Sequence, residues 1–130
     1  MVGIVIVSHS AKVAEGIVDL ASEMASENSH ILAAGGMEDG GIGTDPFRIQ
    51  AAIEAADTGD GVLILADMGS SIMSAETAME FLEESGIQIR IADAPVLEGA
   101  VSAAVTSVSG ADLEEVAAAA EETRGVCKLS

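Results

Sequence analysis

Two short runs of branched apolar residues constrain the fold of this chain more than any other feature. Residues 2–7 read VGIVIV and residues 61–66 read GVLILA. Because neither run alternates with polar residues, each predicts a β-strand buried on both faces, which is typical of a parallel sheet covered by helices. A third run, HILAA at 30–34, predicts another strand of this kind.

Helical patterns fill the segments between these strands. Asp45 and Pro46 predict the start of one helix, because Asp is a favoured N-cap and Pro fits the first helical position. The core of that helix should include Ile49 and Ile53. Apolar residues at intervals of three and four predict an earlier helix, directly after the first strand, with the core stripe Val13, Ile17, Leu20 and Met24.

The second half of the chain continues the alternation. A third helix is predicted to carry Met73, Met79 and Leu82 in its core stripe and to stop at 85–86, and IQIRI at 87–91 predicts a strand near a sheet edge. Further helices are predicted near 96–108 and 111–124. The whole pattern predicts one α/β domain over residues 1–130, an open and mainly parallel sheet of about four strands with helices on both faces.

The composition limits both the core and the partners. With two Phe, no Trp and no Tyr, we expect small and aliphatic residues, including the six methionines, to fill the core. The formal net charge of −17 excludes nucleic acids and anionic membranes as partners. The lone Cys127 and the absence of a signal peptide or apolar span predict a cytoplasmic protein. So large an acid excess favours a salt-adapted source over an ordinary acidic protein.

Polar residues follow the predicted strands where ligands of α/β sheets bind, beyond their carboxyl ends. His9 follows the first strand, at the start of a helix whose free N–H groups suit a phosphoryl group. Asp67 follows the third strand and is the natural partner of His9, because a carboxylate that accepts one imidazole N–H leaves the other nitrogen free to attack. The alternatives are that each residue merely caps its helix. For His30, at the start of a strand, a structural role is expected.

A glycine-rich stretch, GGMEDGGIGT at 35–44, separates the second strand from the helix that Asp45 opens. Glycines let backbone N–H groups turn toward an anion, but no Gly-Lys-Ser/Thr follows, so this is not a P-loop. We expect phosphate contacts from Gly36, Gly43, Thr44 and Ser70. A flexible surface loop is the alternative. Neither a metal site nor a cofactor is expected.

Four segments together resemble the enzyme IIA family of the mannose type, and within it the DhaM subunits of dihydroxyacetone kinases that do not use ATP as phosphoryl donor. They occur in the family's order, each at the end of a predicted strand, although Met68 and Ser71 depart from its usual pattern. The segments are GIVIVSHS at 3–10 with AEG at 14–16, GTD at 43–45, DMGSS at 67–71 and APVLEGA at 94–100.

The resemblance implies a phosphoryl carrier. It implies that His9 accepts a phosphoryl group from HPr, with Asp67 orienting the ring, and passes it to ADP on a DhaL subunit. That subunit would then phosphorylate dihydroxyacetone bound to DhaK. The resemblance also implies a homodimer. Since many DhaM proteins carry further carrier domains after this one, we expect this chain of 130 residues to receive its phosphoryl group from separate proteins.

Two other functions fit the same residues. One is a sugar-transport enzyme IIA that passes its phosphoryl group to a membrane permease, but the segment at 94–100 favours the dihydroxyacetone kinase. The other is a non-catalytic regulatory module. A receiver domain phosphorylated on aspartate is disfavoured, because His9 stands where such a domain has an acidic pair.

Overall fold

The predicted strands form a single parallel sheet. The computed structural model describes residues 1–26 and 28–129. Neighbouring strands pair in the order β2-β1-β3-β4, and every pairing is parallel. The predicted fold class and the edge position of the fourth strand are therefore confirmed. The strands are β1 (Gly3–Ser8), β2 (Ile31–Gly35), β3 (Val62–Ala66) and β4 (Ile89–Ile91).

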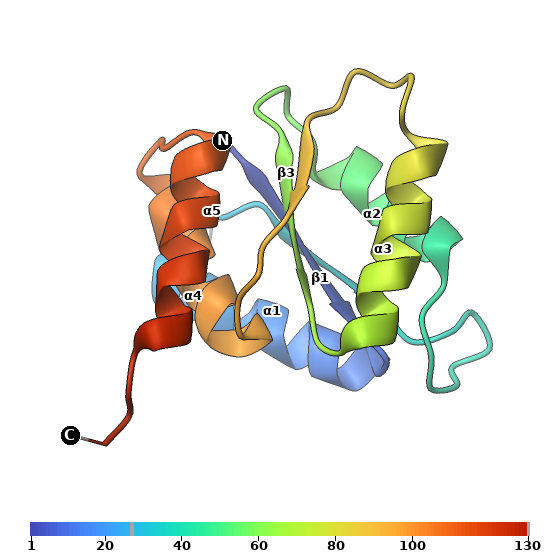
Figure 1. Cartoon of the computed structure of the whole chain (residues 1–130), viewed down its shortest axis with the longest axis horizontal. Helices are drawn as coiled ribbons and strands as arrows, with labels where there is room; N and C mark the ends of the chain where they lie inside the picture. The colour runs from blue at the N-terminus through green and yellow to red at the C-terminus, as the bar shows by residue number, and fades with distance from the viewer. Residues whose placement is uncertain (27, 130) are drawn as a thin grey trace.

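Helices cover both faces of this sheet (Figure 1). Side chains alternate along β1, so that Ile4 and Ile6 pack toward α1, α4 and α5, while Val5 and Val7 pack toward α2 and α3. The sheet residues are therefore buried on both faces, as the apolar runs predicted. The helices are α1 (Ala11–Ala25), α2 (Pro46–Ala56), α3 (Gly69–Phe81), α4 (Val96–Val108) and α5 (Leu113–Glu122), with the 3-10 helix η1 (Thr123–Gly125).

The predicted core stripe of α1 is mostly wrong. Ile17 is buried, but Val13, Leu20 and Met24 are 48 %, 45 % and 61 % exposed. The buried face of α1 is instead made by Ala14, Ile17 and Ala21. Alanines allow α1 to lie very close to β2, where a Cβ built on Gly35 would be 2.8 Å from the Ala14 Cβ. Such a close approach leaves no room beneath the helix for larger side chains.

The methionines do not fill the core, contrary to expectation. Met73, predicted as a core residue of α3, is 68 % exposed, whereas Met79 packs partly against the core and Leu82 is buried. Ala75 and Ala78 make the buried face of α3 together with Ser71. The remaining methionines, all exposed, are Met1, Met24, Met37 and Met68. In α1 and α3, alanines fill the buried helix faces on which methionines were expected.

Other local predictions are confirmed. Asp45 is the N-cap of α2, where its side chain accepts a hydrogen bond from the Phe47 N–H, and Pro46 occupies the first turn. Ile49 and Ile53 are fully buried. The helix predicted near 96–108 matches α4, and the one near 111–124 is α5 followed by η1. No helix in the described part of the chain has the length and apolar character to span a membrane.

Candidate functional site

His9 and Asp67 meet at the point where the strand order switches. β1 and β3 are neighbours at the centre of the sheet, and the chain leaves β1 toward one face and β3 toward the other. This divergence lies at the carboxyl ends of the two strands, the place where ligands bind in open α/β sheets. The side chains of His9 and Asp67 are 19 % and 16 % exposed there.

The Asp67 carboxylate holds both the backbone and the ring of His9. Its Oδ2 accepts the His9 N–H at 3.0 Å, and its Oδ1 lies 3.0 Å from His9 Nδ1. Ser8 Oγ donates to Oδ2 at 2.8 Å, Ser71 Oγ donates to Oδ1 at 2.5 Å, and the Met68 N–H donates to Oδ1 at 2.7 Å. The carboxylate is therefore fixed from several directions at once.

These hydrogen bonds control the charge of Asp67. Burial raises the pKa of Asp67, but the hydrogen bonds from Ser71, from the His9 N–H, from Ser8 and from the His9 ring outweigh it and hold that pKa well below its usual range. An ionised carboxylate only accepts hydrogen bonds, so the proton of a neutral His9 ring lies on Nδ1. The lone pair is left on Nε2, to which the Ser70 hydroxyl donates at 2.5 Å.

Neither residue caps a helix. The N-cap of α1 is Ser10, whose Oγ accepts from the Val13 N–H, and the N-cap of α3 is Met68, without a side-chain bond. The capping alternatives for His9 and Asp67 are therefore wrong. His30 is placed in the way expected for a structural residue, with its Nδ1 2.8 Å from the Ala56 carbonyl oxygen.

The glycine-rich stretch braces the backbone around His9. The Gly36 N–H donates to the Ser8 carbonyl at 3.1 Å, and the Gly43 N–H donates to the His9 carbonyl at 2.8 Å. Both glycines have positive φ, 71° and 143°, which other residues rarely adopt. Thr44 Oγ1 lies 2.6 Å from Ser74 Oγ. The N–H groups of Gly36 and Gly43 and the Thr44 hydroxyl thus already have hydrogen-bond partners within the chain. Phosphate contacts from these three residues stay predictions.

Two serines of the site, Ser8 and Ser71, were not predicted from the sequence. Ser8 is the last residue of β1, and its hydroxyl also accepts the Ser10 N–H. Ser71 is fully buried and lies one helical turn after Asp67, so its hydroxyl reaches back to the carboxylate and to His9 Nδ1, 3.1 Å away. The spacing of four residues between Asp67 and Ser71 could have indicated this contact, because side chains four residues apart on a helix are neighbours.

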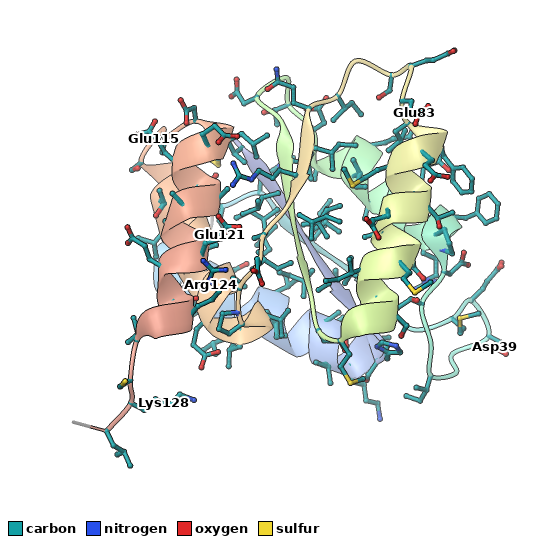
Figure 2. The ribbon with its side chains drawn as sticks, viewed as in Figure 1. Asp39, Glu83, Glu115, Glu121, Arg124 and Lys128 are labelled. Atoms are coloured by element: carbon teal, nitrogen blue, oxygen red, sulfur yellow. The ribbon has the colours of Figure 1, made fainter. Side chains whose placement is uncertain are left out.

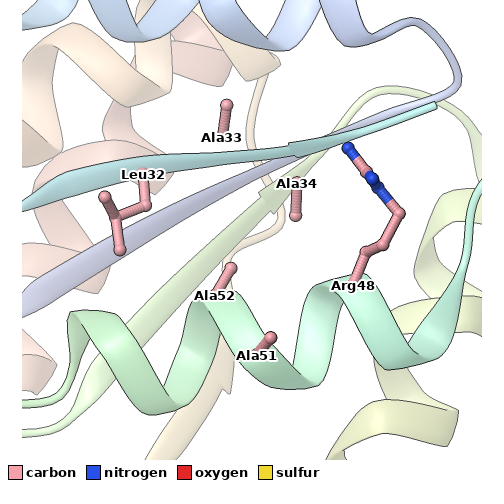
Figure 3. Close-up of a pocket in the computed structure, with 6 residues that line it drawn as sticks. All are labelled: Leu32, Ala33, Ala34, Arg48, Ala51 and Ala52. Carbon is pink, nitrogen blue, oxygen red and sulfur yellow. The ribbon is translucent and has the colours of Figure 1, made fainter. Parts of the chain in front are cut away.

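A shallow hollow elsewhere on the surface is not part of this site. It has a volume of about 340 Å³ and lies between the free edge of β2 and α2 (Figure 3). Arg48 closes one end of it and donates to the Gly35 carbonyl at 3.3 Å. Its lining is Leu32, Ala33, Ala34, Arg48, Ala51 and Ala52, without His9 or Asp67. Within residues 1–26 and 28–129, no three His, Cys, Asp or Glu side chains are grouped to hold a metal ion.

Comparison with protein families decides the classification. Residues 3–117 match EIIA-man, described as the PTS system fructose IIA component. The chain belongs to the EIIA-man family. The resemblance found in the four sequence segments is thereby confirmed, over more of the chain than those segments cover.

Several curated relatives of this EIIA-man chain are DhaM subunits. It is 43 % identical over 120 residues to the phosphoryl donor subunit DhaM of a PEP-dependent dihydroxyacetone kinase from Escherichia coli (strain K12), covering 89 % of this chain and 25 % of that subunit. It is 39 % identical over 117 residues to the corresponding subunit of kinase 2 from Listeria innocua, covering 89 % of this chain and 94 % of the relative. The chain therefore spans a quarter of the first relative and nearly all of the second.

Solved structures have the same architecture. A protein of unknown function, EF1359, aligns with a TM-score of 0.84 and 35 % identity over 100 % of both chains. The phosphotransferase system component EIIA from Streptococcus agalactiae aligns with a TM-score of 0.71 over 98 % of this chain and 97 % of that one. At 14 % identity, the second likeness concerns the fold alone.

Proposed function

We propose that this chain is a phosphoryl carrier in which His9 accepts a phosphoryl group from HPr and passes it to ADP on a DhaL-type subunit of dihydroxyacetone kinase. The observation that carries the proposal is the hydrogen bond between His9 Nδ1 and Asp67, which leaves a nucleophilic lone pair on Nε2. Membership of the EIIA-man family and identity of 39–43 % to DhaM subunits support it.

In the first step, the Nε2 lone pair of His9 attacks the phosphorus of the HPr phosphohistidine. A new N–P bond forms as the old one breaks, and the bonding electron pair returns to the HPr imidazole. The proton on Nδ1 stays in place, so the His9 ring gains positive charge, which the ionised Asp67 stabilises. Before this step the Ser70 hydroxyl must turn away from Nε2, and it can then donate to a phosphoryl oxygen.

In the second step, a β-phosphate oxygen of ADP attacks the phosphorus on Nε2. The N–P bond breaks and its electron pair returns to the His9 ring, which recovers its neutral form with the proton on Nδ1. The DhaL-type subunit would then hold ATP and phosphorylate dihydroxyacetone on a DhaK-type subunit. For this chain, such transfers require positioning and charge stabilisation rather than a covalent step on any other residue.

The names of the relatives favour dihydroxyacetone kinase over sugar transport as the destination of the phosphoryl group. HPr and ADP place the proposed reaction in the cytoplasm. We also propose that the chain forms a homodimer, as the family resemblance implies, and that residues 1–130 are one phosphocarrier domain.

Reconstitution tests the proposal. The chain is mixed with phosphoenolpyruvate, enzyme I, HPr, ADP, DhaL, DhaK and dihydroxyacetone, and dihydroxyacetone phosphate is measured. We expect product that depends on phosphoenolpyruvate, no product with His9→Gln, and nearly normal product with the control His30→Gln. Phosphorylation of the chain without any transfer to DhaL-bound ADP would refute the proposed acceptor, and activity retained by His9→Gln would refute the proposed site.

A further inference from the structure

One side of the β2 backbone does not pair within the sheet that the described residues form. β2 is an edge strand, and the Gly36 N–H that follows it donates to the Ser8 carbonyl of β1. Because the backbone groups of successive residues in a strand point to opposite sides, the odd-numbered residues Ile31, Ala33 and Gly35 face away from β1. These three residues thus form a row of donors and acceptors with which a further strand can pair.

β2 lacks the features that usually protect such an edge. Natural sheets blunt their edges with very short strands, charged side chains or proline. The other edge strand, β4, follows this rule, because it has three residues and one of them is Arg90. β2 has five residues, ILAAG, without charge or proline. An edge of this kind is suited to strand addition, in which an extended peptide pairs with it.

Hollows lie on both sides of this edge, where the side chains of an added strand would point. The hollow of about 340 Å³ lies on the α2 side (Figure 3). A second hollow, of about 370 Å³, lies on the α1 side and is lined by Ala11, Glu15, Ala33, Gly35 and Arg48. Ala33 and Arg48 line both hollows, so the edge itself separates them. Successive side chains of an added strand would enter the two hollows in turn.

The α1 side of the edge is acidic. Glu15, Asp19 and Ser22 follow one another at intervals of four and three residues, so they lie on one face of α1. Glu15 lines the hollow beside β2, and a further hollow of about 540 Å³ continues along this face. Its lining is Asp19, Ser22, Glu23 and Ser26. An added strand would therefore meet carboxylates on this side, and these favour basic side chains.

The α2 side of the edge is apolar and has a single cation. Ala51 and Ala52 leave room there for small apolar side chains, and Arg48 closes the hollow at the carboxyl end of β2 (Figure 3). Arg124 and Lys128 lie beyond the end of α5, where each pairs with a carboxylate (Figure 2). Arg48, by contrast, forms no ion pair with a carboxylate of the described residues. The two sides of the edge therefore favour a strand whose two faces differ.

We infer that the free edge of β2 is a docking site for an extended segment of a partner protein, which binds by strand addition. The segment alternates basic residues, which face Glu15 and Asp19, with small apolar residues, which face Ala51 and Ala52. Main-chain hydrogen bonds along the edge and charge complementarity on the α1 side provide the affinity. The inference does not depend on the proposed function, because this edge faces away from β1, the strand that His9 follows.

A second copy of this chain is disfavoured as the occupant. Identical edge strands related by a two-fold axis pair antiparallel, and this pairing keeps both α1 helices on the same face of the joined sheet. The faces of α1 that carry Glu15 and Asp19 would then point toward each other, and their carboxylates would repel one another.

Labelled peptides test the inference. The probe alternates Lys and Val over about seven residues, a usual strand length, and its binding is measured by fluorescence anisotropy at about 0.15 M NaCl. Two further peptides have the same side chains and charge, but each is methylated on one alternate set of backbone nitrogens. This comparison uses the wild-type chain and does not depend on the folding of a variant.

Variants of the chain provide a second comparison. Ala33→Pro removes a backbone N–H that faces away from β1, a position at which edge strands tolerate proline. Glu15→Gln removes a carboxylate from the α1 side of the edge. Its control is Glu54→Gln, which removes the same charge from an exposed position of α2 outside the hollows.

We expect Ala33→Pro, and one of the two methylated peptides, to weaken binding about tenfold or more, because each removes hydrogen bonds along the edge. Glu15→Gln should weaken binding about threefold, and Glu54→Gln should leave it unchanged. No saturable binding to the wild-type chain, equal affinities for the two methylated peptides, or unchanged binding by Ala33→Pro would overturn the site. A wild-type dimer that Ala33→Pro separates into monomers in light scattering would place a second copy on the edge and overturn the proposed partner.

Discussion

At the residue scale, Asp67 is the most connected side chain of the site. Its carboxylate accepts five hydrogen bonds, from the N–H and Nδ1 of His9, from the hydroxyls of Ser8 and Ser71, and from the Met68 N–H. An asparagine there presents an amide NH₂ to some of these donors and lacks the charge that, in the proposed mechanism, stabilises the His9 ring when it carries a phosphoryl group. One substitution would therefore disturb the tautomer, the orientation and the electrostatics of His9 together.

We expect Asp67→Asn to slow phosphoryl transfer to His9 by about 10²–10⁴-fold, as the loss of an orienting carboxylate does in a catalytic triad. Rapid-quench transfer from phospho-HPr measures the rate. The control is Asp19→Asn on the exposed side of α1, which removes the same charge far from the site. Equal rates for both variants would show that Asp67 has no part in the transfer.

The lowered pKa of Asp67 also predicts how stability depends on pH. Because the folded state holds the pKa below the unfolded value of about 4, folding is favoured most while the carboxylate is ionised in both states. This contribution is complete above pH 4 and is lost as the pH falls from there toward the lowered pKa. Urea unfolding of the wild type and of Asp67→Asn over this acidic range should show a smaller pH dependence for the variant.

The sequence predicts the pairing of His9 with Asp67 but not the serines that support it. His9 and Asp67 could be predicted because both follow apolar runs, and the ends of parallel strands meet at one edge. Ser8 and Ser71 could not be predicted, because serine is common and nothing in the residue type marks a site. Ser8, for example, reaches Asp67 only because the sheet brings together the ends of two strands, although the two residues are 59 positions apart in the sequence. The direction of the glycine N–H groups likewise depends on φ and ψ, which the residue type permits but does not determine.

At the scale of elements, glycines set how closely helices approach the sheet. A Cβ on Gly3 would overlap the carbonyl group of Ala56 at the end of α2. Around a Cβ on Gly16, in the middle of α1, no atom of the described residues lies within 4 Å, apart from its chain neighbours and the backbone of its own helix. The same substitution should therefore have opposite effects at the two positions.

We expect Gly3→Ala to lower the free energy of unfolding by about 1–3 kcal/mol, because β1 and α2 must separate. Gly16→Ala should raise it by about 0.5–1 kcal/mol, because alanine favours the helix and restricts the unfolded chain. Urea unfolding monitored by circular dichroism gives both values. Destabilisation by Gly16→Ala, or tolerance of Gly3→Ala, would contradict the packing described here.

Strands were easier to predict than the faces of helices. The runs at 2–7 and 61–66 are apolar throughout, so they need no choice of face. In α1 the large residues Val13, Leu20 and Met24 form the more apolar stripe, but the helix turns its alanines toward β2. Close packing against the sheet overrides the gain from burying larger side chains, and periodicity alone does not contain that information.

At the scale of the whole molecule, charge is the dominant feature. The 5 Lys and Arg residues cannot neutralise 22 Asp and Glu. Several of these cations already form ion pairs: Arg90 with Glu114 and Glu121, Arg124 with Asp93, and Lys128 with Glu98. The unpaired carboxylates repel one another in the folded state, and dissolved salt screens that repulsion.

We therefore expect the melting temperature to rise by about 5 °C between 0.01 and 0.3 M NaCl, the range in which the Debye length falls most. Differential scanning calorimetry at a fixed pH near 7 measures it. A melting temperature that is constant over this range and rises only at molar salt would point to salting-out of apolar surface instead of charge screening.

Phosphorylation of His9 is the decisive test of whether this chain is a phosphoryl carrier. The chain is incubated with phosphoenolpyruvate, enzyme I and HPr, its intact mass is measured, and the modified peptide is mapped. We expect the addition of one phosphoryl group that is stable in alkali, labile in acid and attached to Nε2 of His9. No adduct from donors that phosphorylate the Escherichia coli DhaM subunit in parallel, or an adduct on His30, would contradict it.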